Sequence, residues 1–287
     1  MCEIEKKIAA VVVLYNPDKT VLKNISTYTS SVGKLYIVDN TPDGKIKKSF
    51  DISSLSNTEY IQLGENKGIA YALNKGMEMA KRDGFKFLLT MDQDSKFEDG
   101  VLEGYLKYAY KLFVENEKIA IIGISHDAYN PKYPEKDWEY AKEIISSGML
   151  ISLARSLYIG NFREDFFIDF VDYEYCYRAW RMGYKAAIIT KYQLTHQIDG
   201  VHPIDFLGIH FNNHNNHNRV RVYYLFRNAL IVMKSYPSTI PEWLILYLKI
   251  WIKTICVEND KLGKLKYSLY GLYDGMTKKM GKIQHNY

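Results

Sequence analysis

The feature that most constrains this sequence is an uninterrupted apolar run near its start. Residues Ile8 to Tyr15 read IAAVVVLY, with no charged residue among them. Such a run is typical of a strand buried on both faces, as in a parallel sheet covered by helices. Asn16-Pro17-Asp18 then breaks the run and offers a helix start. We therefore expect this strand to lie inside a layered α/β domain.

Strand and helix patterns alternate through the next part of the chain. Short apolar runs predict further strands at residues 35–38, 60–63, 85–91, 119–124 and 143–153. Residues 196–218 are rich in His and Asn and predict a long loop, and helical patterns follow from Arg219. We expect an α/β catalytic domain over residues 1–215, with a mostly parallel sheet flanked by helices, and a helical region over residues 216–287.

Composition places the chain among ordinary globular proteins. Of its 287 residues, 47% are apolar and 25% are charged, and the formal net charge is +5. This mild basic excess suits an anionic substrate or membrane surface, but it is too weak to predict a nucleic-acid binder. Cys2, Cys176 and Cys256 lack CxxC spacing, which fits a reducing cytoplasm, and the first residues lack a signal-peptide pattern. We expect a cytoplasmic protein.

Carboxylates stand at the ends of two predicted strands. Asp39 closes the second strand, and Asp92 and Asp94 close the fourth. Ligands of open α/β sheets bind outside the carboxyl ends of the strands. In Asp92-Gln93-Asp94, two hard oxygen ligands two residues apart are able to hold Mg²⁺ or Mn²⁺ while phosphates complete the coordination. An Asp-x-Asp is also common in solvated turns, so only its place after a buried strand favours a metal site.

A second acidic cluster consists of Asp169, Asp172 and Glu174, within a strongly apolar stretch. Burial and like-charged neighbours raise the pKa of a carboxyl group, which suits a general base near neutral pH. The competing interpretation is a helix with acids in its first turn, where the macrodipole favours them. His196 follows a further strand-like run, and it suits a third metal ligand only if the sheet brings it beside Asp94.

Eight motifs in order resemble one family. They are VVVLYN, VDN at Asp39, GENKGIAYALNKGM, MDQDS, SSGMLIS, FIDFVDYEYCYRAWRMGY, the His at 196, and an H-x-x-x-R-x-Y-Y-x-x-R-N pattern from His217 to Asn228. Over roughly residues 8–228 the chain resembles the family 2 glycosyltransferases with a GT-A (Rossmann-like) fold. It resembles particularly the bacterial rhamnosyltransferase-like branch that uses dTDP-rhamnose.

The resemblance implies a donor site. Asp39 would accept a hydrogen bond from the imide N–H of a uracil or thymine base, and Asn66 and Gly68 would let the backbone approach the nucleotide. Asp92 would face the ribose or the metal. The resemblance further implies donor contacts for four residues, two at the end of the first motif and two in the last: Tyr15, Asn16, His217 and Arg221. The last two would neutralise the diphosphate.

The resemblance also implies the chemistry. Asp172 matches the catalytic base, and Asp94, Asp92 and His196 match a site for Mg²⁺ or Mn²⁺. The reaction would be a single displacement with inversion, in which Asp172 deprotonates an acceptor hydroxyl and the metal stabilises the leaving nucleoside diphosphate. The expected product is a surface polysaccharide such as an O-antigen or capsule, built on a saccharide or a lipid-linked saccharide.

Several alternatives stay open. UDP-hexose or UDP-galactofuranose would suit the same fold, and a non-catalytic, glycosyltransferase-like binding subunit is a further interpretation. A nucleotidyltransferase is disfavoured because LYNPDKT lacks a Gly-rich phosphate signature. His202, His210 and His214 are additional histidines in the segment before His217, and its HxxxHxxH spacing (His210, His214, His217) would suit zinc if helical, although a loop that closes over the donor suits this segment better. The lysine-bearing apolar helix after Pro241 suits either a membrane surface at the inner face of the cell or a homodimer interface.

Overall fold

The computed structural model describes residues 3–42, 52, 55–126, 129–196, 204–206, 209–211, 218–256 and 260–284. These residues form two compact units. Unit 1 takes in residues up to 163 and residues 172–197, and unit 2 takes in residues 164–171 and those from 198 onward. The C-terminal unit thus includes a short segment from the middle of the sequence, which the predicted division at residue 215 did not anticipate.

Unit 1 is a mixed sheet between helices. Its strands are β1 (Ile8–Leu14), β2 (Lys34–Asp39), β3 (Thr58–Gln62), β4 (Phe87–Asp92), β5 (Ser95–Lys96), β6 (Ile119–His126), β7 (Trp138–Tyr140), β8 (Met149–Ser152) and β9 (Lys185–His196). Its helices are α1 (Thr20–Thr29), α2 (Ile69–Arg82), α3 (Val101–Glu115), α4 (Leu153–Ile159) and α5 (Val171–Arg181). The predicted α/β fold class is confirmed, with strands at each expected place.

The order of the strands is β3-β2-β1-β4-β8-β6-β9-β5, and β7 pairs with β9. The pairs β3–β2, β2–β1, β1–β4 and β6–β9 are parallel, as expected. By contrast, β8 runs antiparallel to both of its neighbours, β4 and β6. The strand predicted over residues 143–153 forms only from Met149, so residues 143–148 remain outside it at the carboxyl end of β4.

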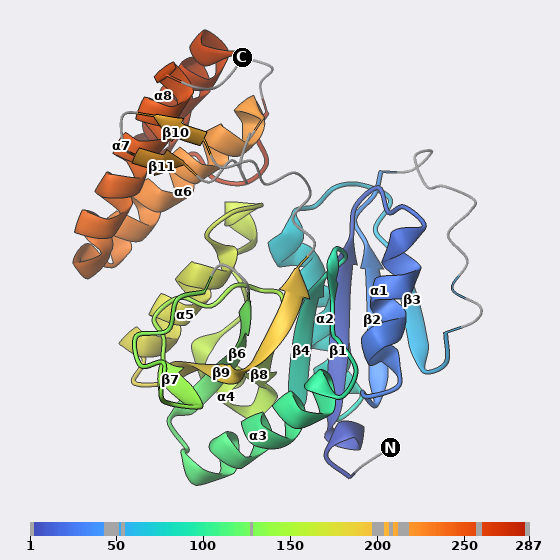
Figure 1. Cartoon of the computed structure of the whole chain (residues 1–287). Helices are drawn as coiled ribbons and strands as arrows, with labels where there is room; N and C mark the ends of the chain where they lie inside the picture. The colour runs from blue at the N-terminus through green and yellow to red at the C-terminus, as the bar shows by residue number, and fades with distance from the viewer. Residues whose placement is uncertain are drawn as a thin grey trace. The chain divides into compact units, whose positions relative to one another are not determined.

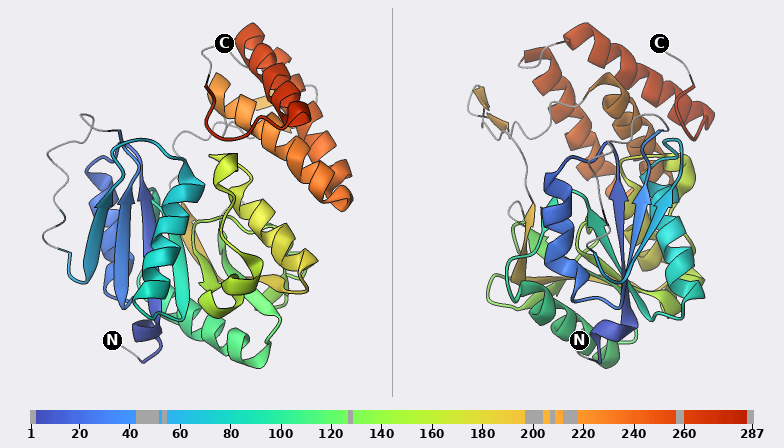
Figure 2. Two further views of the ribbon diagram at one scale, coloured as in Figure 1. Left: turned by 180° about the vertical axis from the view of Figure 1, so that it is seen from behind. Right: turned by 90° about the vertical axis from the view of Figure 1, so that its right-hand side faces the viewer.

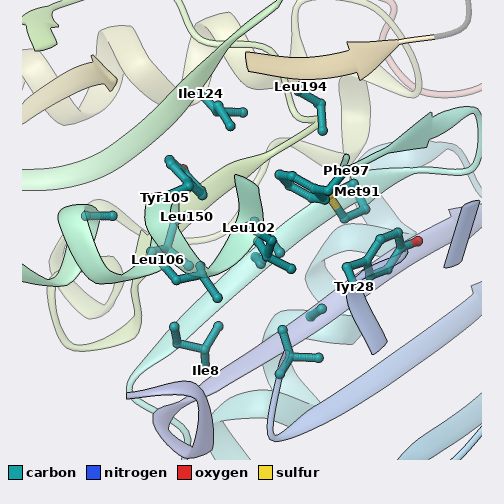
Figure 3. Close-up of a cluster of buried hydrophobic side chains, with 14 of the residues drawn as sticks. Ile8, Tyr28, Met91, Phe97, Leu102, Tyr105, Leu106, Ile124, Leu150 and Leu194 are labelled. Carbon is teal, nitrogen blue, oxygen red and sulfur yellow. The ribbon is translucent and has the colours of Figure 1, made fainter. Parts of the chain in front are cut away.

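The buried character of β1 explains the layers. All seven of its residues are buried, and alternate ones join a core beneath α1 and α3 that includes Ile8, Tyr28 and Tyr105 (Figure 3). Helix α2 covers the opposite face, so that the sheet lies between helices (Figure 2). Apolar side chains on both faces of β1 are therefore removed from water, and their burial stabilises the fold.

Helix α2 approaches β1 closely through Gly76. A Cβ atom placed on Gly76 would lie 2.3 Å from Cγ2 and 2.5 Å from Cβ of Val11. Val11 belongs to a central strand and cannot withdraw as a flexible side chain could. The glycine therefore sets the distance between α2 and the sheet.

Unit 2 is built from α6 (Arg219–Ser235), α7 (Ile240–Cys256) and α8 (Lys261–Thr277). Phe226 on α6 stacks on Tyr247 of α7 with ring centroids 4.3 Å apart, and the Tyr247 hydroxyl donates to the Phe226 carbonyl at 2.5 Å. On α8, Gly271 lets the backbones of α6 and α8 approach, because a Cβ there would lie 2.3 Å from the carbonyl oxygen of Tyr223. The predicted C-terminal helices are confirmed.

The expectation of an unbroken loop over residues 196–218 is wrong in part. Ile204–Phe206 (β10) and Ile209–Phe211 (β11) form an antiparallel pair. His210 therefore lies in a strand, which rules out a continuous helix for the zinc-like spacing. His202 and His214 lie outside the described residues, so the expected closing loop stays a prediction.

We expect Gly76→Ala to lower the free energy of unfolding by about 1–3 kcal/mol, because the added methyl group overlaps Val11. Chemical denaturation followed by circular dichroism would measure the change. Glu78→Ala on the exposed side of α2 is the matched control and should change stability by less than about 0.5 kcal/mol. Equal stability of the Gly76→Ala protein and the wild type would mean that α2 can move away from the sheet without cost.

Candidate active site

The carboxyl ends of three neighbouring strands, β2, β1 and β4, meet where the sheet extends to opposite sides of its first strand. Strand β1 lies between β2 and β4 (Figure 1), with Leu14 opposite Asp39 and Val13 opposite Asp92. All three strands are parallel, so their carboxyl ends share one edge. This is the topological switch point at which open α/β sheets bind ligands. Asp39 and Asp92 thus lie at the same edge of the sheet, and their roles in binding stay predictions.

The loops that follow β1 and β4 are joined by Gln93. The backbone N–H of Tyr15 donates to the Gln93 side-chain oxygen at 2.9 Å, and the Gln93 amide donates to the Tyr15 carbonyl at 3.2 Å. From α1, the Asn24 side chain donates to the Gln93 carbonyl at 3.0 Å. These bonds fix the turn that carries Asp92 and Asp94. Tyr15 is itself 45% exposed, as a group that contacts a ligand should be.

Asp39 is buried completely. One carboxylate oxygen accepts from the backbone N–H of Thr41 at 2.8 Å, and the other accepts from the Tyr60 hydroxyl at 2.6 Å. The Thr41 side chain accepts in turn from the backbone N–H of Asn16, whose φ is +48°. Asp39 thus organises the end of β2, and its contact with a nucleotide base stays a prediction.

The N-terminus of α2 opens onto the same edge. The Asn66 side-chain oxygen accepts from the Asn40 amide and from the Gly68 backbone N–H, both at 3.0 Å. The Asn40 side chain accepts from the backbone N–H of Lys67 at 2.8 Å. Gly68 precedes the helix with φ +89°, a conformation that favours glycine. The predicted role of Asn66 and Gly68 thus has a local basis, since they shape a loop that leads into a helix N-terminus.

The centre of the site is a pair of carboxylates joined by Ser146. Its backbone N–H donates to Asp172 at 3.0 Å, and its hydroxyl donates to Asp92 at 3.3 Å. Ser147 adds a 3.4 Å contact between its hydroxyl and the backbone N–H of Asp92. Ser146 reaches both acids because β8 runs antiparallel, which puts the residues before it beside the end of β4. Neither serine was assigned a role from the sequence, although both belong to the motif SSGMLIS.

Asp172 is the second residue of α5, and burial raises the pKa of its carboxyl group to about 7. The backbone N–H groups of Tyr173 and Ser146 donate to its two oxygens and oppose this rise, whereas the nearby Asp92 adds to it. Burial is the largest of these effects. A carboxylate with a pKa near 7 suits proton abstraction at neutral pH.

Asp94 is exposed in the turn after β4, and the backbone of His196 lies beside it. In the antiparallel pair β5–β9, His196 is opposite Ser95, the residue that follows Asp94. The sheet thus brings the backbone of His196 near Asp94, and its role as a metal ligand stays a prediction because its side chain is outside the described part. Among the side chains that are described, no three His, Cys, Asp or Glu residues form a metal cluster by themselves.

Two other acids of the second cluster have different surroundings. Glu174 is buried and forms a 2.9 Å ion pair with Arg178 one turn later on α5. Asp169 belongs to unit 2, where Arg221 donates to it at 3.1 Å. Burial raises the pKa of Asp169, and Arg221 opposes that rise. Arg221 thus has an acidic partner, and its predicted contact with a diphosphate stays a prediction. His217 lies outside the described residues.

The end of the last motif has a structural role that the sequence did not reveal. The Asn228 side chain donates to the carbonyls of Phe166, Ile168 and Asp169 at 2.8–3.0 Å, and Arg227 donates to those of Asp165 and Phe166. Phe167, Asp169 and Phe170 all have positive φ. These two α6 residues therefore hold a strained segment that leads directly into α5.

Comparison with known proteins places this geometry in a family. Residues 10–189 match the sequence model of Glycosyl transferase family 2. The chain is 26% identical to dTDP-rhamnosyl transferase RfbF of Shigella flexneri, over 99% of this chain and 100% of that protein.

Solved structures share the fold. A structure of GalNAc-T7 with UDP, GalNAc and Mn²⁺ has a TM-score of 0.60 at 11% identity, over 95% of this chain and 56% of that one. Residues 1–349 of S. aureus TarS give 0.58 at 14% identity, over 95% of this chain and 82% of that one. The chain thus spans little more than half of the GalNAc-T7 chain. At such identities the likeness is one of fold alone.

We expect Asp172→Asn to stabilise the protein above pH 7. The folded-state pKa of about 7 exceeds the unfolded value of about 4, so Asp172 destabilises the fold progressively as pH rises between these values. The variant should gain about 1–3 kcal/mol over wild type at pH 8 and little at pH 4. Denaturation at both pH values measures this gain. A gain that does not depend on pH would contradict the raised pKa.

Proposed function

The chain belongs to glycosyl transferase family 2, and on that premise we propose that it is a metal-dependent, inverting rhamnosyltransferase. It would move rhamnose from dTDP-rhamnose to an acceptor hydroxyl during the synthesis of a surface polysaccharide such as an O-antigen or capsule. The observation that carries the proposal is the pair Asp92 and Asp172, held by Ser146 at the switch point of the sheet.

Asp172 is the proposed base. Its carboxylate takes the proton of the acceptor hydroxyl while that oxygen attacks the anomeric carbon of the donor. The bond from this carbon to the diphosphate oxygen breaks on the opposite side, and the nucleoside diphosphate departs with the electron pair. The configuration at carbon is inverted, and the proton remains on Asp172. The raised pKa favours this transfer because the conjugate acid is stable near neutral pH.

A divalent cation would complete the site. The residues fit it in part: Asp92 ends the buried strand β4, Asp94 follows two residues later, and the backbone of His196 pairs with the next residue, Ser95. When bound, Mg²⁺ or Mn²⁺ would supply Lewis-acid stabilisation of the leaving diphosphate, whose oxygens would fill the remaining positions. The Mn²⁺ in the GalNAc-T7 structure supports this part of the proposal.

The full-length similarity to a dTDP-rhamnosyl transferase supports dTDP-rhamnose as the donor. In this proposal Tyr15, Asn16 and the loop at Asn66 and Gly68 receive the nucleotide. Asp39 accepts from the base once the Tyr60 hydroxyl has moved away. His217 and Arg221 would face the diphosphate. UDP-hexose and UDP-galactofuranose are the alternative donors.

The setting in which the enzyme acts is also part of the proposal. The acceptor would be a saccharide or a lipid-linked saccharide, and a lipid-linked one would bring the protein to the cytoplasmic face of the cell membrane. Homodimerisation through the C-terminal helices is the competing use of their surface.

The test of the function is calorimetric titration with dTDP-rhamnose, UDP-glucose and UDP-galactose, each with Mn²⁺ and with chelator. We expect metal-dependent binding of dTDP-rhamnose, and we expect Asp94→Ala to abolish the effect of Mn²⁺. Asp99→Ala removes another exposed carboxylate of this region and should bind like wild type. Unchanged metal dependence in Asp94→Ala would remove Asp94 from the site. Binding of none of the three donors would mean either a donor outside this set, such as UDP-galactofuranose, or a non-catalytic role.

We further expect Asp172→Asn to bind the donor normally and to lose about 10²–10⁴-fold in turnover, because it cannot accept the proton. In the wild type with Mn²⁺ bound, kcat/KM should rise with pH as Asp172 loses its proton. The midpoint should lie below the pKa of about 7 that burial gives the metal-free protein, since a nearby positive charge favours the carboxylate. Transfer assays over a pH series would measure both effects. Full turnover by the variant would assign the base to another group.

A further inference from the structure

Helix α7 exposes a broad apolar stripe. The stripe consists of six large aliphatic residues, each between 38% and 57% exposed: Ile240, Leu244, Ile245, Leu248, Ile252 and Ile255. At 100° per residue they cover less than half of the helix circumference, and the exposed Lys249 lies at one edge. Single exposed apolar residues are normal on a protein surface, whereas six along one side of a helix indicate a binding surface.

The stripe is not a core face that lacks its partner. The opposite side of α7 is already packed, with Trp243, Tyr247 and Thr254 buried. Tyr247 stacks on Phe226, and the Trp251 indole N–H donates to the Ser268 hydroxyl at 2.9 Å. The helix is thus fixed within unit 2 by one side, and the aliphatic stripe on the other side is exposed.

The net charge of the C-terminal region indicates what kind of surface the stripe would bind. Residues 219–287 contain 12 Lys and Arg against 4 Asp and Glu, a net charge of +8, whereas residues 1–218 contain 26 against 29, a net charge of −3. Exposed lysines lie on α7 and on α8, among them Lys249, Lys261 and Lys266. An apolar stripe within a strongly basic region suits a surface that is both apolar and anionic.

We propose that the α7 stripe docks onto an anionic lipid surface, with its six aliphatic side chains among the acyl chains near the headgroups and the lysines of unit 2 on the phosphates. The helix lies in the plane of the membrane rather than across it. None of the helices in the described part of the chain has the length and apolar character needed to cross a bilayer. This docking gives the membrane contact of the proposed function a defined helix face and does not depend on the chemistry of sugar transfer.

The test is flotation of the full chain with phosphatidylcholine vesicles, with and without phosphatidylglycerol, at low and high salt. We expect capture only with phosphatidylglycerol, weaker at high salt. Leu248→Ser/Ile252→Ser should weaken capture by about tenfold or more, because two side chains no longer enter the lipid. The matched control is Leu269→Ser/Met276→Ser, which changes two exposed apolar residues of α8 and should be captured like wild type.

Three results would overturn the proposal: no capture of the wild type, equal capture by neutral vesicles, or equal loss in the α7 and α8 variants. Sedimentation velocity would then test a second copy as the occupant, through a dimer that the α7 variant abolishes. Thermal denaturation and calorimetry with dTDP-rhamnose show whether each variant is folded. Because flotation needs no donor or metal, failure of docking and failure of the proposed transferase activity are separate results.

Discussion

The arrangement depends on one constraint, which is that two carboxylates are held close together at the edge of a buried sheet. Ser146 meets this constraint by donating from its backbone to Asp172 and from its side chain to Asp92. Its own carbonyl accepts from the Thr90 hydroxyl, and the Gly148 N–H donates to the Thr90 carbonyl at 2.9 Å. The segment before β8 is thus fixed to β4 by bonds that do not involve the acids. The carboxylates of Asp92 and Asp172 are thus held near each other despite their like charge. Binding of a cation or a proton would relieve their repulsion.

The polar groups at this edge of the sheet are of two kinds, those that hold the loops in place and those that are exposed to solvent. Asp39 is closed off by Thr41 and Tyr60, and the Gln93 side chain is engaged with the backbone of Tyr15. Tyr15 and Asp94, by contrast, are exposed. Buried polar groups with their hydrogen bonds satisfied rigidify a loop, and exposed side chains can be reached by a ligand from solvent. The geometry therefore separates residues that hold the edge from residues able to meet a ligand.

The buried central strand and the acids at the carboxyl edge of the sheet were predictable because they follow from local sequence patterns. The β-branched run at Ile8 has one stable environment, and acids placed directly after buried strands must emerge at the carboxyl edge. The place of Ser146 was not predictable, because nothing in SSGMLIS signals an antiparallel strand inserted among parallel ones. Nor does a lone His196 reveal that its strand returns beside Asp94, since strand register depends on contacts far apart in sequence. The burial of Asp39 is a similar tertiary effect.

One segment from the middle of the chain groups with the C-terminal helices, and its hydrogen bonds give the physical reason. Residues 164–171 belong with the C-terminal helices because Arg227 and Asn228 donate to their carbonyl groups, and three residues there hold left-handed conformations. Such conformations cost of order 1–3 kcal/mol each and persist only where the surroundings impose them. Without α6, the carbonyls of Phe166, Ile168 and Asp169 would lose the donor they share, and the strained segment would relax. That segment ends where α5 begins, one residue before Asp172. Helix α6 therefore helps to fix the backbone that leads to the proposed base. A catalytic domain cut at residue 215 would lack the donors Arg227 and Asn228.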